Sequence, residues 1–82
     1  MKLTIRLFAT LKEKARAASL SLEFQEDQIT VRELLEKISR EYPELAGSLK
    51  SVLTAVNKDF AFTDDLISAG DEIALFPPVS GG

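Results

Sequence analysis

One long amphipathic helix near the middle of the chain limits the fold more than any other feature of the sequence. Thr30 and Glu33 have the spacing of a capping box and predict the start of this helix. Its apolar face, at helical spacing, consists of Val31, Leu34, Leu35, Ile38 and Tyr42. Pro43 disfavours helical angles at the residue before it and predicts the end. Any sheet in this chain must therefore pack against one dominant helix.

Strand-like segments lie on both sides of this helix. Apolar and polar residues alternate over residues 2–7, where Leu3, Ile5 and Leu7 share one face, and again over 19–24, where Leu20, Leu22 and Phe24 do. Three further strands are predicted over residues 52–56, 60–62 and 72–76. The segments between them predict a short helix over 9–18, a connector over 44–50, a turn over 57–59 and a loop or single helical turn over 63–69.

This order of elements predicts an α+β fold of the β-grasp, or ubiquitin-like, kind. In such a fold a mixed sheet is crossed by one long helix, and the first and last strands pair in parallel at its centre. We expect one domain over residues 1–76 and an extended tail over residues 77–82. The predicted core contains Leu3, Ile5, Leu7, Leu22, Leu34, Leu35, Ile38, Val56 and Ile73.

The end of the sequence predicts a chemical role for the tail. Pro77 and Pro78 lack a backbone N–H, so they end the last strand and favour an extended exit. Extended over residues 77–82, the tail could reach about 20 Å. Gly81 and Gly82 have no Cβ, so the flexible tail could enter a narrow channel and present the Gly82 carboxyl group to a reaction partner. A frayed terminus is the alternative interpretation.

Composition restricts the chemistry that the chain itself could perform. The sequence contains no Cys and no His, and it therefore lacks a thiol nucleophile, an imidazole base and the common ligands of zinc and iron–sulfur sites. We expect no metal site. The formal net charge of −3 argues against nucleic acid as a partner. No segment has the length or pattern of a signal peptide or membrane span, so we expect a cytoplasmic protein.

Three segments resemble the small, sulfur-carrying subunit of molybdopterin synthase. The final residues 71–82 read DEIALFPPVSGG, the opening contains Leu7-Phe8-Ala9 followed by Leu11-Lys12-Glu13, and the middle contains Ala55-Val56-Asn57. The resemblance spans essentially the whole chain. It implies that a ubiquitin-activating-type adenylyltransferase uses ATP to adenylate Gly82, and that sulfur from a sulfurtransferase then replaces AMP to give a C-terminal thiocarboxylate.

The resemblance also implies the partners and the contact residues. The large synthase subunit would supply the catalytic pocket in which sulfur passes to cyclic pyranopterin monophosphate, within a heterotetramer, and the small subunit would bind no stable cofactor. Phe8, Phe60 and Phe76 would form the hydrophobic docking surface, although each could instead belong to the core. The tail residues implied to enter the partner are Pro77, Pro78, Val79, Ser80, Gly81 and Gly82.

Charged residues near these positions receive a simpler interpretation. Asp64, Asp65, Asp71 and Glu72 are expected to form a solvated acidic face, and Arg6 and Lys12 to be solubilising, although the resemblance permits Lys12 a contact with the synthase. Three other functions stay open at this point. They are a sulfur carrier for thiamine synthesis, a ubiquitin-like protein modifier joined through Gly82 to lysines, and a pure interaction module.

Overall fold

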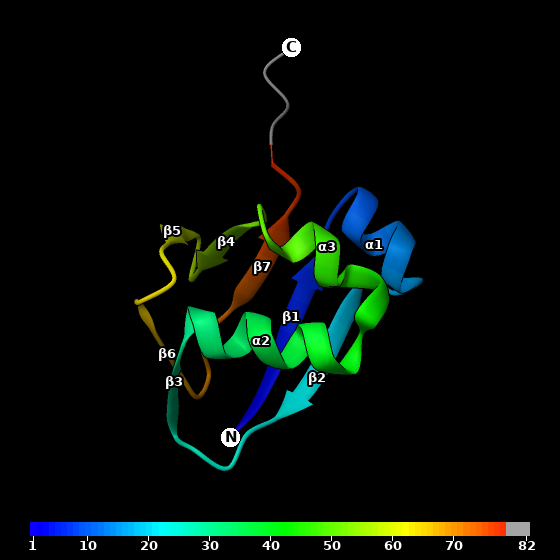
Figure 1. Cartoon of the computed structure of the whole chain (residues 1–82). Coiled ribbons are helices and arrows are strands. Elements are labelled where there is room, and N and C mark those ends of the chain that lie inside the picture. Colours follow the sequence, from blue (N-terminus) through cyan, green and yellow to red (C-terminus); the bar gives the residue numbers. More distant parts are fainter. Residues whose placement is uncertain (79–82) are drawn as a thin grey trace.

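The computed structural model describes residues 1–78 of the chain. Val79, Ser80, Gly81 and Gly82, and with them the expected flexibility of the tail, lie outside the described residues. Figure 1 shows the elements, which in chain order are β1 (Lys2–Leu7), α1 (Thr10–Ala15), β2 (Ser19–Glu23), β3 (Gln28–Thr30), α2 (Val31–Glu41), η1 (Pro43–Leu45), α3 (Ala46–Leu49), β4 (Leu53–Val56), β5 (Asp59–Ala61), β6 (Leu66–Ser68) and β7 (Ile73–Phe76).

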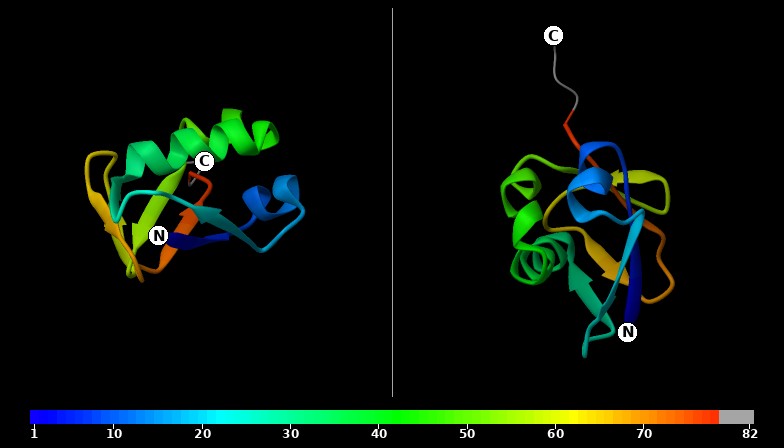
Figure 2. Two further views of the ribbon diagram at one scale, coloured as in Figure 1. Left: turned by 90° about the horizontal axis from the view of Figure 1, so that it is seen from below. Right: turned by 90° about the vertical axis from the view of Figure 1, so that its right-hand side faces the viewer.

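Five strands form one mixed sheet in the order β2-β1-β7-β4-β5. The strands β1 and β7 run parallel at its centre, with Ile5 opposite Ile73 and Leu7 opposite Leu75. The other neighbouring strands are antiparallel. The helix α2 crosses one face of the sheet, whereas no helix of residues 1–78 covers the opposite face (Figure 2). The predicted β-grasp fold and its central parallel pair are confirmed.

A second, two-stranded sheet contradicts the expected loop over residues 63–69. The strand β6 pairs antiparallel with β3, and Ile29 and Ile67 lie opposite each other in the register. Both isoleucines are buried, and the side chain of Gln28 donates a hydrogen bond of 3.1 Å to the Ser68 hydroxyl. Each strand has only three residues, so its alternation was too short to identify in the sequence.

The helix α2 begins and ends as predicted. The Thr30 hydroxyl accepts a hydrogen bond of 3.1 Å from the Glu33 backbone N–H, and the Glu33 carboxylate accepts one of 2.9 Å from the Thr30 N–H. Reciprocal capping of this kind satisfies two backbone donors that a helix otherwise leaves unpaired. Tyr42, directly before Pro43, is the C-terminal cap of the helix.

The core lies between α2 and the sheet, and most of its predicted members are buried. The confirmed members are Leu3, Ile5, Leu7, Leu22, Leu34, Ile38 and Ile73. The prediction was wrong for Leu35 and Val56, which are half-buried and pack against the rim of the core. Leu35 is turned roughly 100° around the helix from Leu34, and this rotation takes it off the face that meets the sheet. Val56 is the last residue of β4, next to the turn.

The helical segments outside α2 differ from their predicted bounds. The helix α1 is shorter than residues 9–18 because Arg16 adopts the left-handed conformation, with φ of 56°, and ends it. The expected connector over 44–50 instead contains η1 and α3. Leu45 and Leu49 are buried there and lie four residues apart, which is a helical spacing that the sequence does carry.

Candidate functional site

The uncovered face of the sheet carries a shallow apolar depression. Its volume is about 330 Å³, and it is lined by Arg6, Phe8, Ala55, Lys58, Phe60, Glu72, Ala74 and Phe76. These residues come from β1, β7, β4 and β5 or from positions directly beside them. Strand register brings them together, because Ala74 lies opposite both Arg6 and Ala55, and Ala55 lies opposite Phe60. We call this set of eight residues the open-face depression.

The depression is shaped by two small side chains between large aromatic ones. Ala55 and Ala74 occupy neighbouring positions on β4 and β7 and leave space between the aromatic rings. Phe60 is 73% exposed, whereas Phe8 and Phe76 are half-buried. Glu72, Ala74 and Phe76 line the depression. Because side chains alternate across a strand, Ile73 and Leu75, which lie between these residues in the sequence, point into the core. The depression is therefore the reverse side of the same strands that build the core.

The rings of Phe8 and Phe76 form a stack at the end of the depression where β7 ends. Their centroids are 4.6 Å apart with an angle of 13° between the ring planes, and the Arg6 guanidinium lies 5.2 Å from the centroid of Phe8. Aromatic stacking and cation–π contacts of this kind each contribute about 0.5–1.5 kcal/mol. Phe76 is the last residue of β7, so the stack fixes the position from which Pro77 and Pro78 continue.

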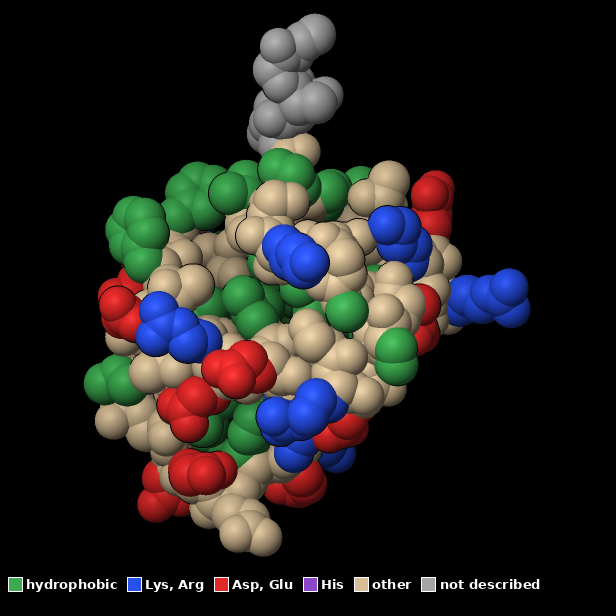
Figure 3. Space-filling view, in the orientation of Figure 1, with side chains coloured by type: hydrophobic (Ala, Val, Ile, Leu, Met, Phe, Trp, Pro, Cys, Tyr) green, Lys and Arg blue, Asp and Glu red, His purple; other side chains and the backbone are tan. Residues whose placement is uncertain are grey.

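The space-filling view shows the end of the molecule at which β7 ends, seen from the side of α2. Hydrophobic side chains gather along the end at which the described chain stops, whereas acidic side chains are more frequent toward the opposite end (Figure 3). Leu53, which is 37% exposed and lies opposite Phe76 in the register, belongs to the apolar end. A protein that receives the tail would meet apolar surface around its root.

The predicted docking residues are therefore brought together. Phe8, Phe60 and Phe76 line one depression, and none of the three is in the buried core. Pro77 is half-buried and Pro78 is exposed, whereas the four tail residues after them lie outside the described residues. Sequence reasoning missed Ala55, Ala74 and Leu53. The signal was present, since each alternates with a core-facing residue of its strand.

A hydrogen-bonded turn supports the charged rim of the depression. Asn57 and Lys58 both have positive φ, of 52° and 72°, in the turn between β4 and β5. The Asn57 side chain donates to the Asp71 carboxylate at 3.0 Å and accepts from the Glu72 N–H at 2.9 Å. Asp71 also accepts from the Ser68 N–H at 2.8 Å. This turn ties β4, β6 and the start of β7 together and holds Lys58 and Glu72 at the rim.

The same hydrogen bonds perturb one titratable group. The Ser68 N–H, and then the Asn57 amide, stabilise the charged form of Asp71 and lower its pKa below the ordinary value of 3.8. Asp71 therefore acts as a fixed acceptor in the turn. A solvated acidic face was predicted for this carboxylate, and for Asp71 the structure shows a structural contact instead.

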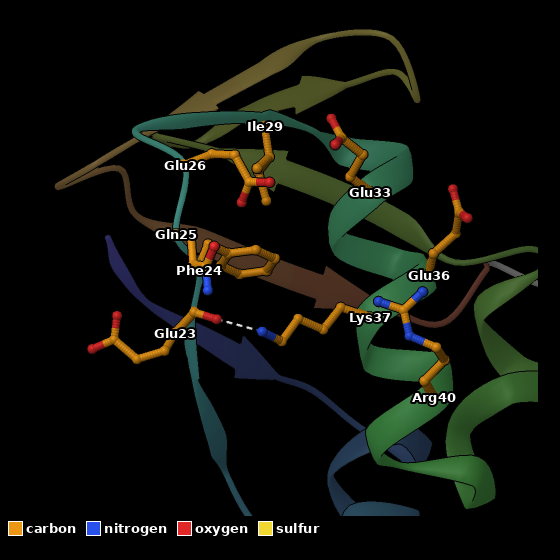
Figure 4. A pocket seen from close by; sticks show the side chains of 9 residues that line it. All are labelled: Glu23, Phe24, Gln25, Glu26, Ile29, Glu33, Glu36, Lys37 and Arg40. Atoms are coloured by element: carbon orange, nitrogen blue, oxygen red, sulfur yellow. Dashed lines mark hydrogen bonds between the residues drawn. The ribbon is translucent and has the colours of Figure 1, made fainter.

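A separate hollow of about 680 Å³ lies between α2 and the segment that joins β2 to β3 (Figure 4). The Lys37 ammonium lies 4.5 Å from the centroid of the Phe24 ring, donates a hydrogen bond to the Glu23 carbonyl and lies 3.7 Å from the Glu41 carboxylate. Lys37 thus connects α2 to the end of β2 on one side of this hollow. Phe24 follows the end of β2 and is half-buried beneath this cation, rather than continuing the strand as predicted.

Two negative findings apply to residues 1–78. This part of the chain contains no group of three or more acidic, His or Cys side chains arranged to hold a metal ion. No helix within the same residues is long and apolar enough to cross a membrane.

Comparison with known proteins decides the family. The ThiS family matches residues 5–82, a range that includes the Gly-Gly ending. The chain belongs to the ThiS family. A family relative, the molybdopterin synthase sulfur carrier subunit of Dictyostelium discoideum, is 38% identical over 80 residues, which cover 95% of this chain and 93% of the relative.

Three further comparisons show similarity to an archaeal modifier protein and to a chain of a molybdopterin-converting factor. Small archaeal modifier protein 1 of Haloferax volcanii is 34% identical over 85 residues, covering 94% of this chain and 97% of the relative. The crystal structure of SAMP1 from that organism has a TM-score of 0.84 at 29% identity and covers 100% of both chains. A complex of subunits 1 and 2 of the molybdopterin-converting factor from Helicobacter pylori contains a chain with a TM-score of 0.69 at 25% identity, with 100% of both covered.

Proposed function

We propose that this chain is the sulfur carrier subunit of a molybdopterin synthase. The observation that carries the proposal is the position of the open-face depression, whose lining includes Phe76, the residue directly before the segment with Pro-Pro and Gly-Gly. A carrier needs both parts, because a docking surface alone performs no chemistry and a tail alone binds weakly. The Dictyostelium relative bears the name of such a carrier.

Activation takes place at the Gly82 carboxyl group and uses a second protein. A free carboxylate is a poor electrophile, so an adenylyltransferase of the ubiquitin-activating type joins it to AMP, and pyrophosphate leaves ATP. A sulfide equivalent supplied by a sulfurtransferase then attacks the acyl carbon, and AMP leaves. The resulting thiocarboxylate carries an ionised sulfur, which is a good nucleophile for the same reason as a thiolate. The ATP that this step consumes is consistent with a cytoplasmic protein.

Sulfur transfer takes place in the pocket of a large synthase subunit. The tail enters that pocket, where the thiocarboxylate sulfur attacks cyclic pyranopterin monophosphate; water then cleaves the acyl C–S bond, which leaves the sulfur on the pterin and returns Gly82 to a carboxylate, and a second transfer completes the dithiolene of molybdopterin. Two sulfur atoms are needed for each product, so two carriers or two loading cycles serve each one. The Helicobacter pylori complex of subunits 1 and 2 supports a large-subunit partner, and a heterotetramer of two large and two small subunits would accommodate two carriers.

Energetics explain why the body must dock as well as the tail. Ordering each backbone residue of the tail costs about 1–2 kcal/mol, so ordering the six residues from Pro77 to Gly82 costs on the order of 10 kcal/mol. Burying an exposed Phe side chain offsets this cost by roughly 2–3 kcal/mol. Phe60, Phe8 and Phe76 lie close enough to contribute to one interface. The stack of Phe8 and Phe76 also reduces the cost because it orders the root of the tail before binding.

Intact-mass analysis tests the proposal directly. After incubation with the activating enzyme, ATP and a sulfur donor, the protein should gain the mass that corresponds to replacing one oxygen by sulfur at Gly82. A reaction without ATP and a variant that lacks Gly82 are the controls, and neither should gain mass. An unchanged mass in a system that loads a known carrier would contradict the proposal.

A second function has support from one specific comparison. The similarity to small archaeal modifier protein 1 favours a protein modifier, which would use the same activated Gly82 to form an isopeptide bond with a lysine side chain. Mass spectrometry of trypsin-digested lysate separates the two: Lys58 is the last basic residue of the chain, so a modified lysine would carry the peptide of residues 59–82. Adducts that disappear with the Gly82-deleted variant would establish modification, and molybdopterin formation without adducts would exclude it.

A further inference from the structure

Phe62 is an exposed aromatic residue that the open-face depression does not include. Its side chain is 78% exposed, slightly more than the 73% of Phe60. Ala61 between them is half-buried and packs against the core, so the rings on either side of it point away from the core. Phe62 directly follows β5, the edge strand of the sheet. The apolar surface of Phe60 therefore continues beyond the edge of the depression.

The backbone of Phe62 is held in place although its ring is free. The Phe62 N–H donates to the Asp65 carboxylate at 2.7 Å, and the Phe62 carbonyl accepts from the Asp65 N–H at 3.0 Å. This turn is joined to the start of α2, because the Arg32 N–H donates to the Thr63 carbonyl at 2.9 Å and its guanidinium forms a 2.9 Å salt bridge with Asp64. A ring held on such a scaffold loses little backbone freedom on binding, which favours affinity.

The size of a protein interface places Phe62 within reach of a partner that covers the depression. A standard interface buries about 800 Å² on each side, which corresponds to a disc with a radius of roughly 16 Å. Two residues along an extended chain span roughly 7 Å, so a partner centred near Phe60 reaches Phe62. Exposed aromatic residues that extend an apolar patch are typical of interaction sites. The occupant that we assign to this surface is the large synthase subunit, because a similar chain is found in the complex of subunits 1 and 2 of the molybdopterin-converting factor from Helicobacter pylori.

We propose that Phe62 is a further anchor residue for the large synthase subunit, so that the interface extends past β5 toward the turn over residues 62–65. This inference rests on the proposed function. The Phe62 ring is 78% exposed, and Phe62 is not among the hydrophobic residues of 1–78 that pack against the core, so removing the ring should cost the fold little. Most of the ring is therefore available to a partner.

The experiment compares Phe62→Ala and Phe62→Leu with Phe60→Ala as the matched variant inside the depression. We expect Phe62→Ala to raise the Kd for the cognate large subunit about tenfold, equivalent to about 1.4 kcal/mol, and Phe62→Leu to raise it by less. The rate of adenylate formation should stay within about twofold, and the melting temperature should be unchanged. Calorimetry, an adenylation assay and thermal melts give these three quantities.

The outcomes separate this inference from the proposed function. If the wild-type chain does not bind the large subunit, both fail. If it binds, Phe60→Ala weakens binding and Phe62→Ala does not, then only the assignment of Phe62 is wrong. Slower adenylation with unchanged binding would assign the ring to the activating enzyme and overturn the proposal. A soluble paramagnetic agent provides a measurement without mutation, because the ring signals of wild-type Phe62 should be attenuated in the free chain and protected in the complex.

Discussion

The two faces of the central sheet are built from the same strands but differ in the burial of their side chains. On the covered face, Ile5, Ile73 and Leu75 are buried beneath α2. On the open face, Phe8, Phe60 and Phe76 are left partly or largely exposed, in a chain of only 82 residues. Period-two alternation therefore places core residues on one side and the partly or largely exposed aromatic residues on the other. Substitutions on the two faces should have separable effects.

The strongest test of this separation removes Gly82, which lies outside the described residues. We expect sulfur transfer to fall by at least about a hundredfold, because a chain one residue shorter places its carboxylate roughly 3.3 Å short of the reactive position. The free energy of unfolding should change by no more than about 0.5 kcal/mol. Molybdopterin formation and thermal melts measure the two effects. Full activity in the folded, shortened protein would refute the carrier mechanism.

A matched pair on α2 tests the covered face. Leu34→Ala should destabilise the fold by about 2–5 kcal/mol, because it leaves a cavity in the core. Leu35→Ala should cost less than half as much, since Leu35 is half-buried and its site can be filled by water. Chemical denaturation of both variants measures the difference. Equal losses would show that the rim of the core is as tightly packed as its centre.

The open face is tested by Phe60→Ala and Phe76→Ala. Each should weaken binding to the large subunit by about 1–3 kcal/mol, as central aromatic anchors do. Phe76→Ala should also lower stability slightly because it removes the stack with Phe8, whereas Phe60→Ala should not. Calorimetry and thermal melts on the same samples separate the two properties. Wild-type affinity in both variants would remove the depression from the interface.

The smallest effect concerns the turn that supports the rim. The pKa of Asp71 is lowered in the folded protein, so its carboxylate stabilises the fold above the ordinary value of 3.8, and this contribution is lost as the pH falls through the lowered pKa. Asp71→Asn should cost about 0.5–1.5 kcal/mol at neutral pH, the value of a typical hydrogen bond. It should also flatten the loss of stability in acid. Thermal melts from pH 7 downward measure this, with Asp27→Asn as the exposed control. If the turn were unimportant, the melting temperature of Asp71→Asn would follow the same pH profile as that of the wild type.

Features with a long or repeated signal could be predicted from the sequence. The apolar face of α2 and the alternation over β1 each extend over a whole element, and the capping box at Thr30 marks where the helix begins, so the fold and the central strand pair were predicted correctly. The strands β3 and β6 were not, because each offers a single buried residue, Ile29 or Ile67, and its partner lies far away in the sequence. Local pattern carries no information about such a partner.

The candidate site shows the same distinction between local and distant information. Resemblance placed Phe8, Phe60 and Phe76 on one surface, but the spacing of these residues does not predict a shared depression. Their meeting depends on the register of three strand pairs and on two small residues, Ala55 and Ala74, between them. Half-burial of Leu35 likewise depends on how α2 is rotated against the sheet, which the sequence of the helix does not specify.

The central position of β7 has a consequence for the order of folding. Its neighbours in the sheet, β1 and β4, are separated by about half of the sequence, and β7 is the last strand of the described residues 1–78. A sheet whose central strand comes so late in the sequence cannot close during translation until β7 has been synthesised. Until then, β1 and β4 have unpaired edges, which favour aggregation and capture by chaperones. The segment that follows Phe76 is thus presented on a native scaffold only after β7 has completed the sheet. An activating enzyme that also binds the open face would therefore act on folded molecules and not on incomplete ones.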